Sequence, residues 1–346
     1  MRTTQFLMAA VLVSACGGKL PGGKNIPGGD KVPGGLGGES GMVDPNTCGN
    51  YAGEAAGAKL KFFLEAVADL DKRSQETVEV VKTSCKMMGT ELGMAAGDLE
   101  GDTKAVCDKV WAAYNNNLKV AIKSKAALKI TYKPAVCKVD VQATAEVAAK
   151  CEGKASADVG ASCSGTCKGT CEGKCEGSAA GKAGTGGSGG AAQGQCNGEC
   201  KGTCKGECEG HADVKASGQC KAKAQATASA DVKCTEPEFS VTLDAKLVVD
   251  KSKAEQTIAA MKAGFPKLLS LSARIKPLQA AVKTTVAAAA ELKDMGPSFA
   301  QSFKDQAMCI SGQIGAAVNA ATHIEANVSV SVEVSASASA SAGGGA

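Results

Sequence analysis

Seventeen cysteines are the residues of this chain best suited to chemistry, either as disulfides or as thiolate ligands of a soft metal. Twelve of them form six pairs whose residue numbers each add to 371, namely Cys137 with Cys234, Cys151 with Cys220, Cys163 with Cys208, Cys167 with Cys204, Cys171 with Cys200, and Cys175 with Cys196. A constant sum is typical of an antiparallel hairpin, because residue i then faces residue 371 − i. The hairpin would turn in a Gly-rich tip at 178–194. The pattern predicts a disulfide ladder between two arms.

The spacing within each arm supports this hairpin. The inner pairs lie in CxGx repeats of period four, and the outer pairs keep even spacings, so all sulfurs would share one face of a β-ribbon. Directly opposed Cα atoms are about 4.5–5.5 Å apart, which a disulfide can span. Glycines would oppose one another as well, Gly165 with Gly206 and Gly169 with Gly202. A compact stack of Cys/Gly turns, with other sulfur partners, is the alternative shape.

Soft-metal binding is the alternative to a disulfide ladder. Eight cysteines at CxxxC spacing could hold a soft metal as thiolates. Zinc and iron–sulfur sites favour CxxC spacing, however, and a thiolate cluster gives no reason for mirrored pairs. The same register opposes Asp140 to Asp231 and Asp158 to Asp213, which we interpret as solvated carboxylates rather than a calcium site. We therefore predict no metal site and no cofactor.

The N-terminus predicts the compartment. Residues 1–15 combine one early arginine with an apolar core too short to span a bilayer, as in a signal peptide. Val13-Ser14-Ala15-Cys16 resembles the lipobox of bacterial lipoproteins, so we expect cleavage before Cys16 and acylation of this cysteine, including palmitate. The non-acidic Gly17 favours an outer-membrane lipoprotein, on the periplasmic or the surface-exposed face. The sixteen remaining cysteines would pair in an oxidising space.

Composition divides the mature chain into segments. Residues 16–50 carry PGG repeats with little apolar content and are typical of a tether behind the lipidated cysteine. Residues 51–135 have helical periodicity, with a helix start at Asp102 and Thr103. Helical periodicity returns over 251–326, where Pro266, Pro277 and Pro297 would each begin a new helix.

The cysteine-rich hairpin occupies residues 136–250. Strand alternation appears there in KVDVQATAEV, AQATASADVK and EFSVTLDAKLVV, and residues 327–346 are predicted to form a C-terminal Ser/Val/Ala strand or tail. The predicted fold class is α+β, a helical bundle base with a long disulfide-laddered antiparallel β-hairpin. If fully extended, residues 137–175 would reach roughly 125 Å at about 3.3 Å each.

Four cysteines remain outside the ladder, all in or beside the helical part. Cys85 and Cys107 would lie on adjacent helices, which pairs them with each other and leaves Cys48 for Cys309. Four cysteines allow three connectivities, all of which keep the base separate from the ribbon.

The remaining motifs do not support an enzyme. The two histidines, His211 and His323, are expected to be solvated or packed residues, and no phosphate loop, GxSxG or HExxH motif occurs. Nucleic acid is not an expected partner, because 36 lysines and 3 arginines are interspersed with acids and the repeat carries no aromatic residues. We predict a non-enzymatic envelope lipoprotein with a structural or interaction role in adhesion, spacing or surface assembly. Its partners would be the membrane, through the lipid anchor, and an envelope protein or polysaccharide.

The lipobox, the CKxxGxELGM motif that runs from Cys85 to Met94 and the CxGxCxGxC run together resemble a group of uncharacterised lipoproteins from delta-type, largely myxobacterial, proteobacteria. The resemblance covers most of the mature chain. It implies an origin and a lipoprotein class, and it implies no activity or ligand.

The lipobox generates a first prediction. Replacing Cys16 with Ser should remove the acylated residue and release the protein from membranes, as measured by fractionation and by the intact mass of the mature chain. Unchanged membrane retention, with the signal segment still present in the mature mass, would contradict the lipoprotein interpretation.

Overall fold

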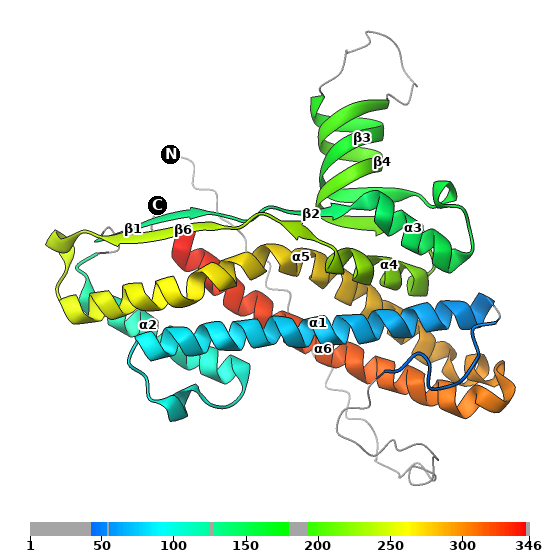
Figure 1. Ribbon diagram of the computed structural model, residues 1–346, viewed down its shortest axis with the longest axis horizontal. Coiled ribbons are helices and arrows are strands. Elements are labelled where there is room, and N and C mark those ends of the chain that lie inside the picture. Colours follow the sequence, from blue (N-terminus) through cyan, green and yellow to red (C-terminus); the bar gives the residue numbers. More distant parts are fainter. Residues whose placement is uncertain (1–42, 54, 125–126, 180–192, 344–346) are drawn as a thin grey trace. The chain divides into compact units, whose positions relative to one another are not determined.

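The computed structural model describes residues 43–53, 55–124, 127–179 and 193–343. The signal peptide, Cys16, most of the tether and most of the Gly-rich tip lie outside the described residues. The fold is α+β, with long helices and two antiparallel sheets (Figure 1).

Four long helices make up the helical base: α1 (Ala55–Glu91), α2 (Thr103–Ala121), α5 (Lys251–Gln301) and α6 (Ala307–Gly343). Their apolar residues form two clusters, around Phe63 and Leu292 in one and around Met261 and Phe265 in the other. Asp102 begins α2 as expected, since its carboxylate accepts hydrogen bonds from the amides of Lys104 and Ala105. Helices from both sides of the hairpin therefore share one base.

The C-terminal segment is helical, and the predicted strand is wrong. Ten of the twelve residues buried along α6 recur at alternating intervals of four and three, at Ile310, Ile314, Ala317, Ala321, Ile324, Val328, Ser331, Ser335, Ala338 and Ala342. The other two, Gln313 and Val334, each lie one residue before a member of this stripe. Such alternating intervals are those of one face of an α-helix. In the last turns most of the buried positions are Ser or Ala, and the alternating valines there led to the prediction of a strand. Ser331 is compatible with burial because its hydroxyl donates to the Asn327 carbonyl at 2.9 Å.

Helix α5 runs for 51 residues, so the prediction that its prolines begin new helices is also wrong. Pro266, Pro277 and Pro297 all lie within it. An interior proline removes one backbone donor and bends a helix. Figure 1 shows α5 curving along its length, and packing against α1 and α6 outweighs the local cost of the prolines.

Two helices replace the strands predicted on either side of the repeat. They are α3 (Val141–Glu152) and α4 (Gly218–Ala230), both rich in alanine. Asp140 caps α3 by accepting from the Ala143 amide, and Gly153 ends it with a positive φ of 67°. The short alternation KVDV continues only through strand β2 (Cys137–Asp140) before this cap.

The stem of the hairpin keeps the 371 register. Strand β1 (Leu128–Lys133) pairs with β6 (Glu238–Leu243), and β2 pairs with β5 (Lys233–Cys234), with residue numbers that add to 371 in both pairs. β1 lies inside the segment predicted to be helical; its alternating Leu128 and Ile130 face the helices instead, and both are buried. The long strands β3 (Ala161–Ala179) and β4 (Gln193–Val214) follow beyond α3 and before α4.

Glu152 ties the root of β3 to the helical base. Its carboxylate accepts from Lys59 Nζ on α1 at 2.7 Å and from the Ser217 amide, just before α4, at 2.6 Å. Only 9% of its side chain is exposed. Burial raises the pKa of Glu152, but the hydrogen bonds from Lys59 and Ser217 outweigh it and lower the pKa from 4.5 to about 2.

This lowered pKa predicts a pH-dependent loss of stability. Ionised Glu152 stabilises the fold above about pH 4.5, and this contribution is lost as the pH falls towards 2. Glu152→Gln should therefore lower the free energy of unfolding at pH 7 by about 2 kcal/mol. In denaturant unfolding, the difference from the native protein should shrink as the pH falls through this window. The exposed Glu146→Gln on the same helix is the control, and an equal effect of both variants would contradict the assignment.

Candidate functional site

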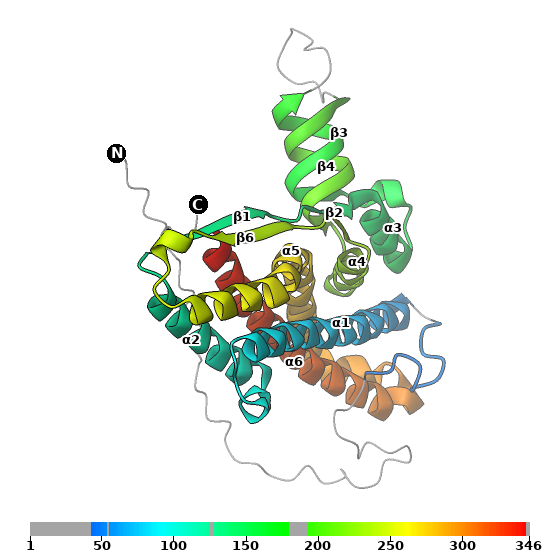
Figure 2. The same cartoon turned by 60° about the vertical axis from the view of Figure 1, so that its left-hand side comes forward.

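Strands β3 and β4 pair with each other along both edges. On one edge the residue numbers add to 375, as in Gly169 opposite Gly206, and on the other edge they add to 365, as in Gly169 opposite Cys196. Residues 206 and 196 thus flank the same residue although they are ten apart on one strand. The ribbon therefore wraps one full turn in ten residues and closes on itself through a seam between 166–172 and 193–199. Figures 1 and 2 show the two strands winding around each other as a coil.

The cysteines face the interior of this coil, which we call the β coil (residues 161–179 and 193–214). Cys167 and Cys208 are fully buried, and Cys171 and Cys204 are 1% exposed. The four disulfides of the coil join Cys163 to Cys208, Cys167 to Cys204, Cys171 to Cys200, and Cys175 to Cys196, with Cα–Cα distances of 5.5, 6.1, 5.7 and 5.9 Å. Each bond joins the two cysteines that the sequence analysis paired.

The geometry of these bonds differs from the predicted ladder of rungs. Cys167 lies directly opposite Cys208 in the strand register but is bonded to Cys204, four residues away. The bonds cross the interior of the coil because a shift of four residues in a ten-residue turn places the bonded sulfur on the far side of the same turn. A repeat of period four cannot reveal this shift, since moving the register by four places Cys on Cys and Gly on Gly.

Glycine makes the coil possible. Gly169 has a φ of 158°, and a Cβ there would lie 2.2 Å from the carbonyl oxygen of Lys205 on the opposite strand. Its opposed residue is Gly206, which has a φ of 141°, and not Gly202 as predicted from the flat hairpin. Opposed glycines therefore recur along the ribbon at the positions where the backbones approach most closely.

The outer face of the coil is polar. Lys174 opposes Lys201 and Glu176 opposes Glu199, but the diagonal pair Lys201–Glu176, at 2.9 Å, offsets these like charges. The hydrogen bonds from Lys201 and Lys174 hold the pKa of Glu176 below its ordinary value. Exposed ion pairs of this kind contribute little stability, so the coil is stabilised mainly by its disulfides and by the backbone hydrogen bonds between its strands.

The root of the coil is fastened by two more disulfides and one extra strand. Cys137–Cys234 joins the directly opposed strands β2 and β5, and Cys151–Cys220 joins α3 to α4 rather than two strands. Strand β2 also pairs with β4 at Val139 opposite Cys208, on the edge of β4 away from β3. The coil is therefore continuous with the four-stranded sheet β3-β4-β2-β5.

The four remaining paired cysteines lie in the helical base. Cys85 of α1 bonds Cys107 of α2, and Cys48 bonds Cys309 at the start of α6. With these, sixteen cysteines are disulfide-bonded. His211 lies on β4 opposite Ser164, and His323 is exposed on α6, so the structure does not bring the two together with a nucleophile.

The aspartates that a flat hairpin would place opposite each other are separated in the structure. Asp140 is the cap of α3, and Asp213 lies opposite Ser162 and pairs with Lys221 at 2.6 Å. Within the described ranges, no group of three or more His, Cys, Asp or Glu side chains is placed to hold a metal ion.

No protein-family model, curated protein or solved structure matches this chain. Among the described helices, none combines the length and the apolar character needed to cross a bilayer.

The glycine geometry predicts a sensitive position in the coil. Gly169→Ala places a methyl group against the Lys205 carbonyl at a strained φ, so it should destabilise the coil by about 1–3 kcal/mol and speed amide hydrogen exchange in residues 161–179. Gly97→Ala is the matched control, because a Cβ there meets nothing within 4 Å. Equal exchange protection in the two variants would show that the coil does not require glycine at 169.

Proposed function

We propose that this protein is a non-enzymatic cell-envelope lipoprotein that uses the β coil as a stiff projection for adhesion, spacing or surface assembly. The observation that carries the proposal is the coil itself, in which disulfides take the place of a hydrophobic core inside a closed two-stranded ribbon. A two-stranded ribbon without such support is marginally stable in water.

The fastening of the coil suits a part that bears load or contacts a surface. Cys137–Cys234 and Cys151–Cys220 clamp both arms at the root, so the arms cannot separate without breaking a covalent bond. The coil's outward residues are mostly lysine, glutamate, threonine and serine, which keep the projection soluble and offer hydrogen-bonding groups to an envelope protein or a polysaccharide.

An oxidising compartment is the expected setting for this many disulfides. The lipobox at Cys16 supports attachment to the outer membrane through a lipid. Soft-metal binding is less well supported, because a sulfur engaged in a disulfide is not a thiolate ligand.

A coil-replacement variant tests the proposal. Ala161 and Val214 are directly opposed, so a two-residue Asn-Gly turn can replace residues 162–213. The replacement removes the pairing of β2 with β4 at Cys208 but keeps the two disulfides of the root, Cys137–Cys234 and Cys151–Cys220. The variant should keep its helical circular dichroism and its membrane attachment, while binding of the purified protein to isolated envelope material should fall at least about tenfold. The control removes the Cys85–Cys107 disulfide in the base by replacing both cysteines with alanine, which should leave binding unchanged.

Two results would contradict the proposal. Undiminished envelope binding by the coil-replacement variant would show that the coil is not the interacting part. Free thiols in the mature protein that bind zinc stoichiometrically would favour the metal-binding function instead.

A further inference from the structure

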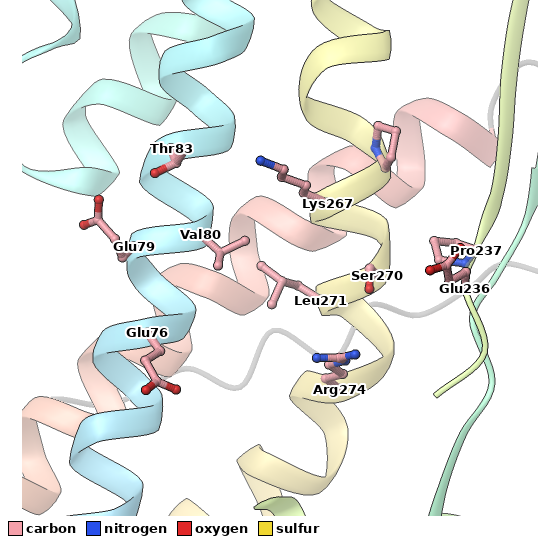
Figure 3. Close-up of a pocket in the computed structure, with 11 residues that line it drawn as sticks. Glu76, Glu79, Val80, Thr83, Glu236, Pro237, Lys267, Ser270, Leu271 and Arg274 are labelled. Carbon is pink, nitrogen blue, oxygen red and sulfur yellow. The ribbon is translucent and has the colours of Figure 1, made fainter. Parts of the chain in front are cut away.

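A cavity of about 740 Å³ opens between α1, α5 and the segment that joins β5 to β6 (Figure 3). Val80, Leu271 and Pro237 provide apolar surface, and Val80 is 36% exposed although Val81 next to it is buried. Pro266, inside the bent helix α5, also lines it. This volume lies within the range of small-molecule and peptide sites.

Acidic and basic side chains line different walls of the cavity. Glu76 and Glu79 lie on α1, whereas Lys267 and Arg274 lie on α5, as Figure 3 shows. None of the ion pairs found among the described residues involves any of these four side chains. Lys267 reaches toward α1, where its Nζ lies 3.8 Å from the Met87 sulfur rather than beside a carboxylate. Acidic side chains thus line the α1 wall and basic side chains the α5 wall, although Figure 3 shows the Glu79 carboxylate turned away from α5.

Arginine is rare in this chain, and it occurs at this cavity. The chain has only three arginines among 39 basic residues, and both of those in the described part, Arg73 and Arg274, line adjoining cavities. The second cavity, of about 230 Å³, shares Glu76, Val80, Leu271 and Arg274 with the first. The Nε of Arg73 is enclosed there and has no hydrogen-bond partner among the described residues. A guanidinium binds a carboxylate with two parallel hydrogen bonds, which lysine cannot do.

We propose that the two adjoining cavities, which together we call the groove, bind a short peptide with free termini. The peptide carboxylate would lie at Arg274 and Arg73, and an apolar side chain would lie against Val80 and Leu271. The terminal ammonium would lie at Glu76, which lines both cavities, with Glu79 adding negative charge on the same wall. An isolated phosphate would meet the glutamates as repelling charges, so the paired walls favour a zwitterion over a simple anion. This site is separate from the β coil and does not depend on its function.

Calorimetric titration of the full chain with the tripeptide alanyl-leucyl-alanine tests the site. We expect saturable binding that weakens at least about tenfold when the peptide is N-acetylated and C-amidated, because each blocked end loses a charge-assisted hydrogen bond. Arg274→Lys keeps the positive charge but removes the planar guanidinium that donates two parallel hydrogen bonds, and it should weaken binding by about tenfold. Glu76→Gln combined with Glu79→Gln should weaken it similarly. Lys276→Ala, exposed on the same helix outside both cavities, should have no effect.

Several outcomes would overturn the proposal. These are an absence of saturable binding, equal binding of the free and the blocked peptide, or unchanged affinity in Arg274→Lys and in the double glutamine variant. A further arm uses glycerophosphoethanolamine, which carries a phosphate and an ammonium group. Binding of this compound in preference to the tripeptide would assign the groove to a lipid headgroup and overturn the peptide assignment. Because Arg274 is exposed, its variant should unfold at the same temperature as the native protein, and this measurement accompanies each titration.

Discussion

The narrow interior of the β coil is the constraint on which the rest of the structure depends. A ribbon that closes in ten residues per turn leaves room inside for little more than pairs of sulfur atoms. Larger apolar side chains would open the seam between 166–172 and 193–199 and expose two strand edges. Cysteine fills this space and also links it covalently, while glycine at the alternate inward positions allows the backbones to approach. The CxGx repeat is thus the simplest sequence that satisfies both demands.

The coil needs a base because its own two strands have no hydrophobic layer to pack on. The apolar cluster around its root is built from alanines and valines of α3 and α4 together with the buried cysteines. Glu152 and the Cys151–Cys220 disulfide, which are neighbours in sequence, connect this root to the helices. Covalent and ionic links therefore meet at the end of α3, where the coil joins the base.

The helical base provides a second surface with different chemistry. Its prolines bend α5, and one of them, Pro266, lines the groove between α5 and α1. Its charged side chains form no ion pairs with the part of the chain that the structure describes, and Val80 is exposed beside them, in contrast to the ion-paired outer face of the coil. We therefore propose different partners for the two surfaces, a broad polar surface for the coil and a small zwitterion for the groove.

Cysteine spacing alone determined the partners of the disulfides and the register of the stem. Residue numbers that add to 371 relate the six outer and inner pairs, and they also hold for β1 with β6 and β2 with β5. The signal is the mirrored order of the cysteines along the two arms, because partners are separated by 21 to 97 residues and share only the constant sum. The constant sum therefore predicts the correct partners whether the arms form straight strands, helices or a coil.

Tertiary structure decided what the arms become. Curling shifts the pairing from 371 to 375, by one repeat, which a period of four conceals, and it adds a second paired edge at 365. The small residues of α3, α4 and α6 are compatible with strand or helix, and only packing against neighbouring helices selects the helix. Likewise, α5 continues through its prolines because long-range burial outweighs a local preference. The groove lay outside sequence reasoning because its walls come from helices nearly 200 residues apart, and the scarcity of arginine was the one signal that pointed to it.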